Sequence, residues 1–364
     1  MGAVYNYLQT LASLSLSRGT PPDFAAGAGV LAWRAKPMEF RTLGRTDWKI
    51  STVSFGAWAI GGTFGTVKDD ESMAALHRAL DRGVNFFDTA DVYGDGRSER
   101  LLARLRKERK EPFYITTKAG RRLPKQTVEG YSKKNIHAFV ERSLKNLAVE
   151  TIDLLQIHCP PTDAFYHPEV FELFDDLVKA GKIRFYGVSV ERVEEGLKAL
   201  DYPGVQSVQM VYNMFRQRPR DLFLDEARRR KVGVLARLPL SSGMLAGKMT
   251  RASKFAEDDH RNYNREGEHW DKGETFSGVP YEVGLAAVEE LKKLVPKETK
   301  MATFALRWIL MHEAITCVIP GAKRPAQVDD NCDAGDLPAL NDETMAAVHA
   351  IYEKRIKKHV HWYW

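Results

Sequence analysis

The feature that most constrains the fold is a repeated alternation of short apolar runs with longer amphipathic segments. The runs expected to form strands are 53–57, 84–88, 113–118, 153–158, 183–189, 205–211, 232–236 and 315–319. The segments expected to form helices are 70–82, 97–107, 133–147, 168–180, 191–200, 220–231, 282–295 and 300–312. Repeated strand–helix units imply a parallel sheet. Eight units in roughly 300 residues fit a single α/β domain folded as a (β/α)8 TIM barrel.

A doubly wound sheet is the alternative architecture, and it requires a glycine-rich turn after the first strand. Glycines do occur there, at Gly56, Gly61, Gly62 and Gly65. Their spacing is not the GxGxxG fingerprint, and no capped helix follows at once. We therefore expect a flexible loop in this region and favour the barrel.

The two ends of the sequence differ in character. Residues 1–37 are rich in Ala, Gly, Ser and Leu and hold one acid, so we expect a disordered or non-native leader, with a targeting segment as the alternative. The barrel domain is expected to span 38–364 and to open with a β-hairpin over 39–51. The aromatic and histidine-rich end, His359 to Trp364, is expected to pack against the barrel or to contact another subunit.

Composition excludes several classes of partner. The net charge of +6 is spread widely, and the basic runs 104–110 and 228–231 fall late in expected helices, where cations suit the dipole. No patch interleaves basic and aromatic residues, which argues against nucleic acid. No run is long enough to span a bilayer. The three cysteines form no CxxC pair and no metal-ligand spacing, which is typical of a reducing, cytoplasmic location.

One connection is much longer than the others. Residues 246–281, after the seventh strand, are polar and irregular. A long excursion in a compact domain is usually a functional lid or a disordered loop, and the sequence leaves both open. Its acids and histidines lack helical ligand spacing, so we expect no metal site.

Four titratable side chains follow successive strands. Asp88 ends one strand, with Tyr93 five residues later in a loop, and Lys118 and His158 end the next two strands. In a parallel barrel these ends converge on one face, where chemistry takes place.

Together these four groups suit carbonyl reduction. An ammonium lowers the pKa of a neighbouring phenol, a carboxylate holds the ammonium, and an imidazole can orient a carbonyl oxygen. Because no side chain supplies hydride, a nicotinamide cofactor is required. The chemical alternative is a Schiff-base aldolase that uses Lys118 as the nucleophile.

Longer motifs give the chain a specific resemblance. They are 87–94 (FDTADVYG), 116–118 (TTK), 155–158 (LQIH), 187–189 (GVS), 209–213 (QMVYN), 239–248 (PLSSGMLAGK) and 318–322 (VIPGA). In these the chain resembles the aldo-keto reductase superfamily, and within it the bacterial branch of inositol-utilisation and general-stress reductases. The resemblance covers residues from Phe40 to about Ile351.

The resemblance implies a catalytic tetrad with Tyr93 as proton donor, Lys118 as the group that tunes its pKa, Asp88 as the partner of Lys118, and His158 as the carbonyl-orienting group. It implies a cofactor site formed by Trp58, Ser189, Gln209, Arg237, Pro239, Leu240, Ser242, Gly243, Lys248, Gly321, Lys323, Arg324, Gln327, Asp330 and Asn331.

Within that cofactor site the resemblance gives several residues a role of their own. Ser189 and Gln209 match residues that hold the nicotinamide amide, and Arg237 with 239–245 matches the loop along the pyrophosphate. Asp330-Asn331 matches the acid–Asn pair near the adenine, although Glu is commoner there. Val190 stands where the family often has Asn.

The same resemblance predicts an NADPH-dependent reductase of aldehydes, ketones or sugar-like carbonyls, acting as a monomer or weak homo-oligomer. Lys323 and Arg324 could pair with a 2′-phosphate, which favours NADPH over NADH. The alternative from another class is a cofactor-binding regulatory subunit, since some relatives serve ion channels in that way.

Overall fold

A computed structural model describes residues 38–62, 65 and 67–364 of the chain, so the predicted leader at 1–37 lies outside the described residues. The first described element is the expected hairpin. β1 (Phe40–Thr42) pairs antiparallel with β2 (Lys49–Ser51).

Eight parallel strands form the second sheet, in the order β10-β9-β8-β7-β6-β5-β4-β3. They are β3 (Phe55–Gly56), β4 (Phe86–Asp88), β5 (Tyr114–Ala119), β6 (Ile152–His158), β7 (Ile183–Ser189), β8 (Val205–Val211), β9 (Gly233–Arg237) and β10 (Ile315–Val318). Parallel bridges from Val53 to Val318 and from Gly56 to Gly321 join the two edges. The predicted (β/α)8 barrel is confirmed.

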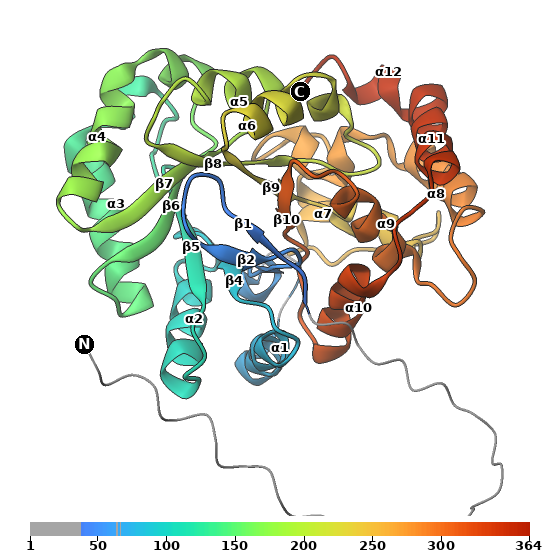
Figure 1. Ribbon diagram of the computed structural model, residues 1–364, viewed down its shortest axis with the longest axis horizontal. Coiled ribbons are helices and arrows are strands. Elements are labelled where there is room, and N and C mark those ends of the chain that lie inside the picture. Colours follow the sequence, from blue (N-terminus) through green and yellow to red (C-terminus); the bar gives the residue numbers. More distant parts are fainter. Residues whose placement is uncertain (1–37, 63–64, 66) are drawn as a thin grey trace, which may run out of the picture. The chain divides into compact units, whose positions relative to one another are not determined.

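Helices follow the strands in turn. The helices of the repeat are α1 (Asp69–Asp81), α2 (Arg97–Glu108), α3 (Lys133–Leu147), α4 (Pro168–Lys179), α5 (Val193–Ala199), α6 (Phe223–Arg229), α8 (Tyr281–Lys292), α9 (Met301–Leu310) and α10 (Pro325–Asp336). Figure 1 shows α2 to α6 outside the ring of strands. α11 (Asp342–Ile351) and α12 (Lys357–Val360) end the described chain. No helix among the described residues is long and apolar enough to cross a membrane.

Two helices start two or three residues later than the sequence predicted, each for a local reason. α5 begins at Val193 because the Glu195 carboxylate accepts hydrogen bonds from the backbone N–H groups of residues 191 and 192, which caps the helix there. α6 begins at Phe223 because Leu222 adopts a non-helical φ of −150° after a short 3₁₀ turn.

The hairpin closes the amino end of the barrel. Trp48 stacks on Tyr114 with ring centroids 4.2 Å apart, and Arg41 Nη1 donates to the Ile315 carbonyl over 2.7 Å. Trp48 also belongs to a buried cluster inside the ring that includes Ile50, Phe86 and Leu235. In Figure 1 the hairpin, in blue, lies across the strands. Functional side chains are therefore left to the opposite, carboxyl end of the strands.

The long connection after β9 is the expected excursion, and it carries local order. It contains α7 (His260–Tyr263) and two 3₁₀ turns, Lys272–Glu274 and Phe276–Gly278. Asp259 caps α7 and Asp271 caps the first of those turns through side-chain hydrogen bonds to backbone N–H groups. Of the two predicted alternatives, the structure favours an ordered segment over a disordered loop.

Candidate active site

The four predicted catalytic residues come together at the carboxyl ends of β4, β5 and β6. Lys118 Nζ lies 2.7 Å from Asp88 Oδ2, 2.8 Å from the Thr89 carbonyl oxygen and 3.3 Å from Tyr93 Oη. The rings of Tyr93 and His158 meet edge to face with centroids 6.2 Å apart. Residues up to 70 positions apart in the sequence thus lie close together, because parallel pairing places the carboxyl ends of the three strands side by side.

The buried ion pair is well satisfied. Lys118 is 1% exposed and Asp88 4% exposed. The other carboxylate oxygen of Asp88 accepts a 2.7 Å hydrogen bond from Gln209 Nε2. A buried charge is tolerated only when it is paired and hydrogen-bonded in this way. Asp88 therefore fixes the ammonium of Lys118 at the Tyr93 hydroxyl.

Glycines place Tyr93 at the wall of the site. Gly94 adopts φ +59°, and a Cβ there would lie 2.3 Å from the Gly61 carbonyl oxygen. A Cβ on Gly61 would in turn lie 3.0 Å from the Tyr93 backbone. Only glycine allows both the left-handed turn and the close approach of these loops. The glycine turn 94–96 thus lets the backbone beside Tyr93 adopt this conformation.

The pKa values of the site differ in direction. Burial raises the pKa of Tyr93, and the Lys118 ammonium lowers it but does not compensate, so the net direction is upward. The effect of the Lys118 ammonium on the pKa of Tyr93 thus has the predicted sign, but burial, which the sequence did not reveal, outweighs it. Burial and the cations Arg121 and Lys118 hold the pKa of His158 well below its usual value, so His158 is a neutral imidazole at physiological pH. A neutral ring can still donate one N–H hydrogen bond.

A cleft of about 1010 Å³ opens over these residues. The predicted residues that line it are Trp58, Asp88, Tyr93, His158, Ser189, Gln209, Arg237, Pro239, Leu240, Ser242, Gly243, Gly321, Lys323 and Gln327. Lys118 lies below its floor, since it is buried under Tyr93.

Four predicted cofactor residues do not line the cleft. Lys248 and Arg324 are exposed and do not belong to the lining. Asp330 forms an ion pair with Lys300, and Asn331 Nδ2 donates to the Gly321 carbonyl over 3.3 Å. The Asn331 contact supports the Gly321 turn, so this residue acts on the cleft through its wall.

One end of the cleft has the character of a phosphate site. α10 begins at Pro325, and Gln327 Oε1 caps it by accepting hydrogen bonds from the backbone N–H groups of Lys323 and Arg324. The start of a twelve-residue helix favours anions because its backbone N–H groups and dipole point outward. With the Lys323 ammonium in the lining, this end fits the phosphates of a dinucleotide.

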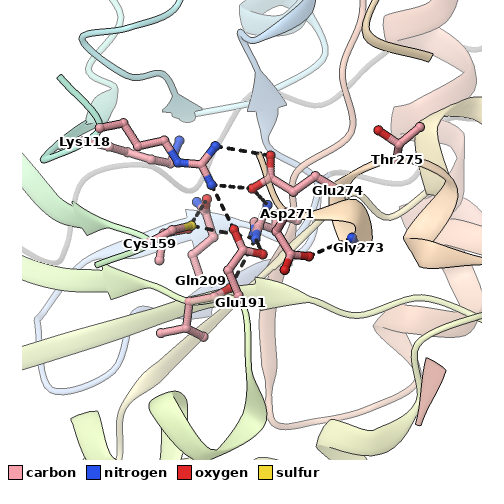
Figure 2. A network of polar contacts seen from close by, with 12 residues as sticks. Lys118, Cys159, Glu191, Gln209, Asp271, Gly273, Glu274 and Thr275 are labelled. Carbon is pink, nitrogen blue, oxygen red and sulfur yellow. Dashed lines mark hydrogen bonds and ion pairs between the residues drawn. The ribbon is translucent and has the colours of Figure 1, made fainter. Parts of the chain in front are cut away.

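The end of the cleft beside His158 holds a network of four charged side chains. Arg121 Nη2 lies 2.8 Å from Glu191 and 2.7 Å from Glu274, and Arg237 contacts the same two carboxylates at 2.8 Å and 2.9 Å. Figure 2 shows Glu191 and Glu274 on facing sides of the network, with Cys159 beside Glu191. Arg237 lines the cleft as predicted, and its guanidinium pairs with two carboxylates; its role along a pyrophosphate stays a prediction.

Sequence reasoning missed three members of this network. Arg121 follows β5 and Glu191 follows β7, so both stand just past strand ends, a signal that could have found them. Glu274 comes from the long connection and carried no such signal.

Three side chains in and beside the network are of the types that bind metal ions, but their pairing and protonation do not suit a cation. Ligand atoms of Cys159, Glu191 and Glu274 lie within 4.8 Å of one another. Both carboxylates already pair with guanidinium groups, and burial raises the pKa of the Cys159 thiol to about 12, so no thiolate is present at neutral pH. These residues do not fit a cation.

Known proteins resemble this chain both in sequence and in structure. A sequence model of the Aldo/keto reductase family matches residues 52–353. The chain is 30% identical over 325 residues to Aldo-keto reductase YhdN of Bacillus subtilis (strain 168), covering 88% of this chain and 95% of that protein. It is 28% identical to a probable voltage-gated potassium channel subunit beta of Arabidopsis thaliana, covering 88% of this chain and 98% of that one. Among solved structures it resembles the glycerol dehydrogenase AKR11B4 from Gluconobacter oxydans, with a TM-score of 0.70, 30% identity, and coverage of 89% and 96%.

Proposed function

Because the chain belongs to the aldo/keto reductase family and is an oxidoreductase, we propose that it reduces an aldehyde or ketone with NADPH as hydride donor. The single observation that carries this proposal is the Lys118 ammonium held between Asp88 and the Tyr93 hydroxyl, at 2.7 Å and 3.3 Å. That arrangement supplies a phenol able to give up its proton beside a cleft large enough for a dinucleotide and a small substrate.

Each residue of the tetrad has a distinct task. A bound nicotinamide supplies hydride to the carbonyl carbon, since no side chain can. Tyr93 donates its phenolic proton to the carbonyl oxygen as that oxygen becomes negative. Lys118 stabilises the resulting phenolate, and Asp88 keeps Lys118 in place. His158 donates an N–H hydrogen bond to the same oxygen and, being neutral, adds no positive charge beside Lys118.

Cofactor preference rests on the phosphate end of the cleft. Lys323 in the lining and the exposed Arg324 stand at the start of α10, where an adenosine 2′-phosphate would meet two cations and a helix terminus. Hydrogen-bonding groups for the nicotinamide amide are available on Ser189 and Gln209, whose side chains lie 3.4 Å apart. A small carbonyl or sugar-like substrate and a cytoplasmic location complete the proposal.

The aldolase alternative is disfavoured by the same geometry. A Schiff base requires a neutral amine that substrate can reach. Lys118 does not line the cleft. Burial lowers the pKa of its ammonium, but Asp88 and Tyr93 together raise that pKa by more, so Lys118 stays protonated. The regulatory-subunit alternative is supported by the similarity to channel beta subunits, and turnover of a carbonyl substrate would distinguish the enzyme from it.

The test is the loss of NADPH absorbance with a panel of aldehydes and ketones. We expect Tyr93→Phe to lower kcat by about 10²- to 10⁴-fold, the usual contribution of a general acid, while NADPH still binds. Tyr263→Phe is the matched control, because Tyr263 also lines the cleft but no lysine contacts its hydroxyl among the described residues. Full activity of Tyr93→Phe, or an equal loss in both variants, would contradict the assignment of the acid.

A further inference from the structure

The last described residue, Trp364, is buried against the long connection. It is 8% exposed, whereas Trp362, two positions earlier, is 73% exposed. The guanidinium of Arg216 lies over the Trp364 ring at 4.4 Å, and Arg218 Nη1 donates to the Trp364 carbonyl over 2.8 Å. The expected packing of this segment against the barrel is therefore achieved by Trp364 and not by Trp362.

Two glycines of the connection are shaped to receive this ring. A Cβ on Gly273 would lie 2.8 Å from Trp364 Cε2, and a Cβ on Gly278 would lie 2.5 Å from Trp364 Cη2. Distances under about 3.0 Å are not tolerated between carbon atoms in a packed interior. Any larger residue at either position would displace the indole of Trp364. The ring therefore packs directly against residues 273–278.

A hydrogen bond extends this contact to the cleft. Trp364 Nε1 donates to Asp271 Oδ1 over 2.7 Å, and the same oxygen accepts from the Gly273 N–H at 2.7 Å. Figure 2 shows Asp271 joined to Gly273 beside Glu274. The cap starts the turn Lys272–Glu274, whose last residue enters the charged network. Trp364 is thus connected to the cleft wall through one aspartate and one short turn.

We propose that Trp364 is a positioning residue for the end of the cleft beside His158, where the substrate carbonyl would lie: by holding residues 271–278 it keeps Glu274 between Arg121 and Arg237. The inference deepens the proposed function, on which its catalytic consequences rest. With Glu274 in place the network has two cations and two carboxylates. With Glu274 withdrawn it keeps two cations and one carboxylate, so that end of the cleft gains positive charge. Trp364 therefore sets the preference between neutral and anionic carbonyl substrates.

Amide hydrogen exchange tests the structural half without any assumption about activity. Trp364→Ala removes a cation–π contact and a hydrogen bond to a carboxylate, so we expect exchange over 271–278 to rise by about ten- to hundredfold. Trp364→Phe retains the ring and loses only the hydrogen bond, and we expect a smaller rise. Trp362→Ala is the matched control and should leave exchange unchanged. A Trp364→Ala variant that loses thermal stability yet exchanges 271–278 at the wild-type rate would overturn the proposal.

Kinetics test the link to the substrate. We expect Trp364→Ala to raise KM for a neutral aldehyde and to lower it for a carboxylate-bearing aldehyde, each by about tenfold, with a smaller change in kcat. Glu274→Gln should give the same reversal, and the double variant should add little because both changes act on one carboxylate. Faster exchange without this reversal would overturn the link to specificity. Absence of any carbonyl turnover in the wild type would instead defeat the proposed function and leave the exchange result standing.

Discussion

Replacing Lys118 by methionine separates what the buried ion pair does for catalysis from what it does for stability. The substitution keeps the length and apolar stem of the side chain and removes its charge. Nζ lies 3.3 Å from Tyr93 Oη and 2.7 Å from Asp88, so one change removes the cation from both partners. The fold, the cleft and the position of the Tyr93 ring should otherwise be retained.

The catalytic effect can be estimated from the distance. At an effective dielectric constant of about 20, unit charges 3.3 Å apart attract each other by about 5 kcal/mol. Most of this attraction exists only once Tyr93 has become a phenolate, so it stabilises the transition state more than the bound substrate. We expect kcat to fall by about 10³-fold, which corresponds to about 4 kcal/mol.

The stability effect has a different origin. Without Lys118, Asp88 stays buried with hydrogen bonds from Gln209 and Gln156 as its remaining side-chain support. Breaking a buried ion pair in this way costs about 3–5 kcal/mol of unfolding free energy. In the double variant Asp88→Asn with Lys118→Met no charge is stranded, and most of that loss should be recovered.

The assay measures kcat, NADPH affinity and denaturant unfolding for the wild type, Lys118→Met and the double variant. We expect the double variant to be nearly as stable as the wild type and as inactive as the single one. If stability and kcat recovered together, or if Lys118→Met kept kcat within about tenfold, the electrostatic role of Lys118 would be refuted.

Three further predictions concern other parts of the structure. Replacing Lys323 and Arg324 by alanine should weaken NADPH by about 10- to 100-fold more than NADH in equilibrium titrations, since each charge-assisted bond to phosphate is lost only with NADPH; equal losses would remove the phosphate assignment. Burial and, to a smaller extent, the Glu99 carboxylate raise the pKa of Asp91 to about 7. The folded protein therefore keeps a proton on Asp91 that the unfolded chain releases near pH 4, so the free energy of unfolding falls as pH rises from about 4 to about 7. Asp91→Asn should flatten that decline in thermal melts taken across this range, and parallel wild-type and variant curves would contradict it. Gly94→Ala should cost about 1–3 kcal/mol in chemical unfolding, because φ is +59° and the new Cβ would meet the Gly61 carbonyl oxygen; a fully stable variant would show that the turn can rearrange.

The family resemblance and the strand ends singled out four residues that lie together in the structure, because both signals are local properties of sequence. Asp88 and His158 end their strands, and Lys118 stands one residue before the end of its strand. Because β4, β5 and β6 pair in parallel, their carboxyl ends lie side by side, and the three side chains come close together. The electrostatic balance at Tyr93 could not be obtained this way, since its pKa depends on burial by residues from several other elements.

The alternation of apolar runs and amphipathic segments by itself determined the barrel and the end of the barrel at which the four titratable side chains meet, because strand and helix periodicities are properties of neighbouring residues. Only the tertiary structure decided which charged side chains lie beside the tetrad. Glu274 pairs with Arg121, which lies 153 positions away in the sequence, and Trp364 bonds to Asp271, which lies 93 positions away. No local sequence pattern predicts such long-range pairs. They form because each charge or indole N–H, once buried by the folded barrel, must find a partner within reach.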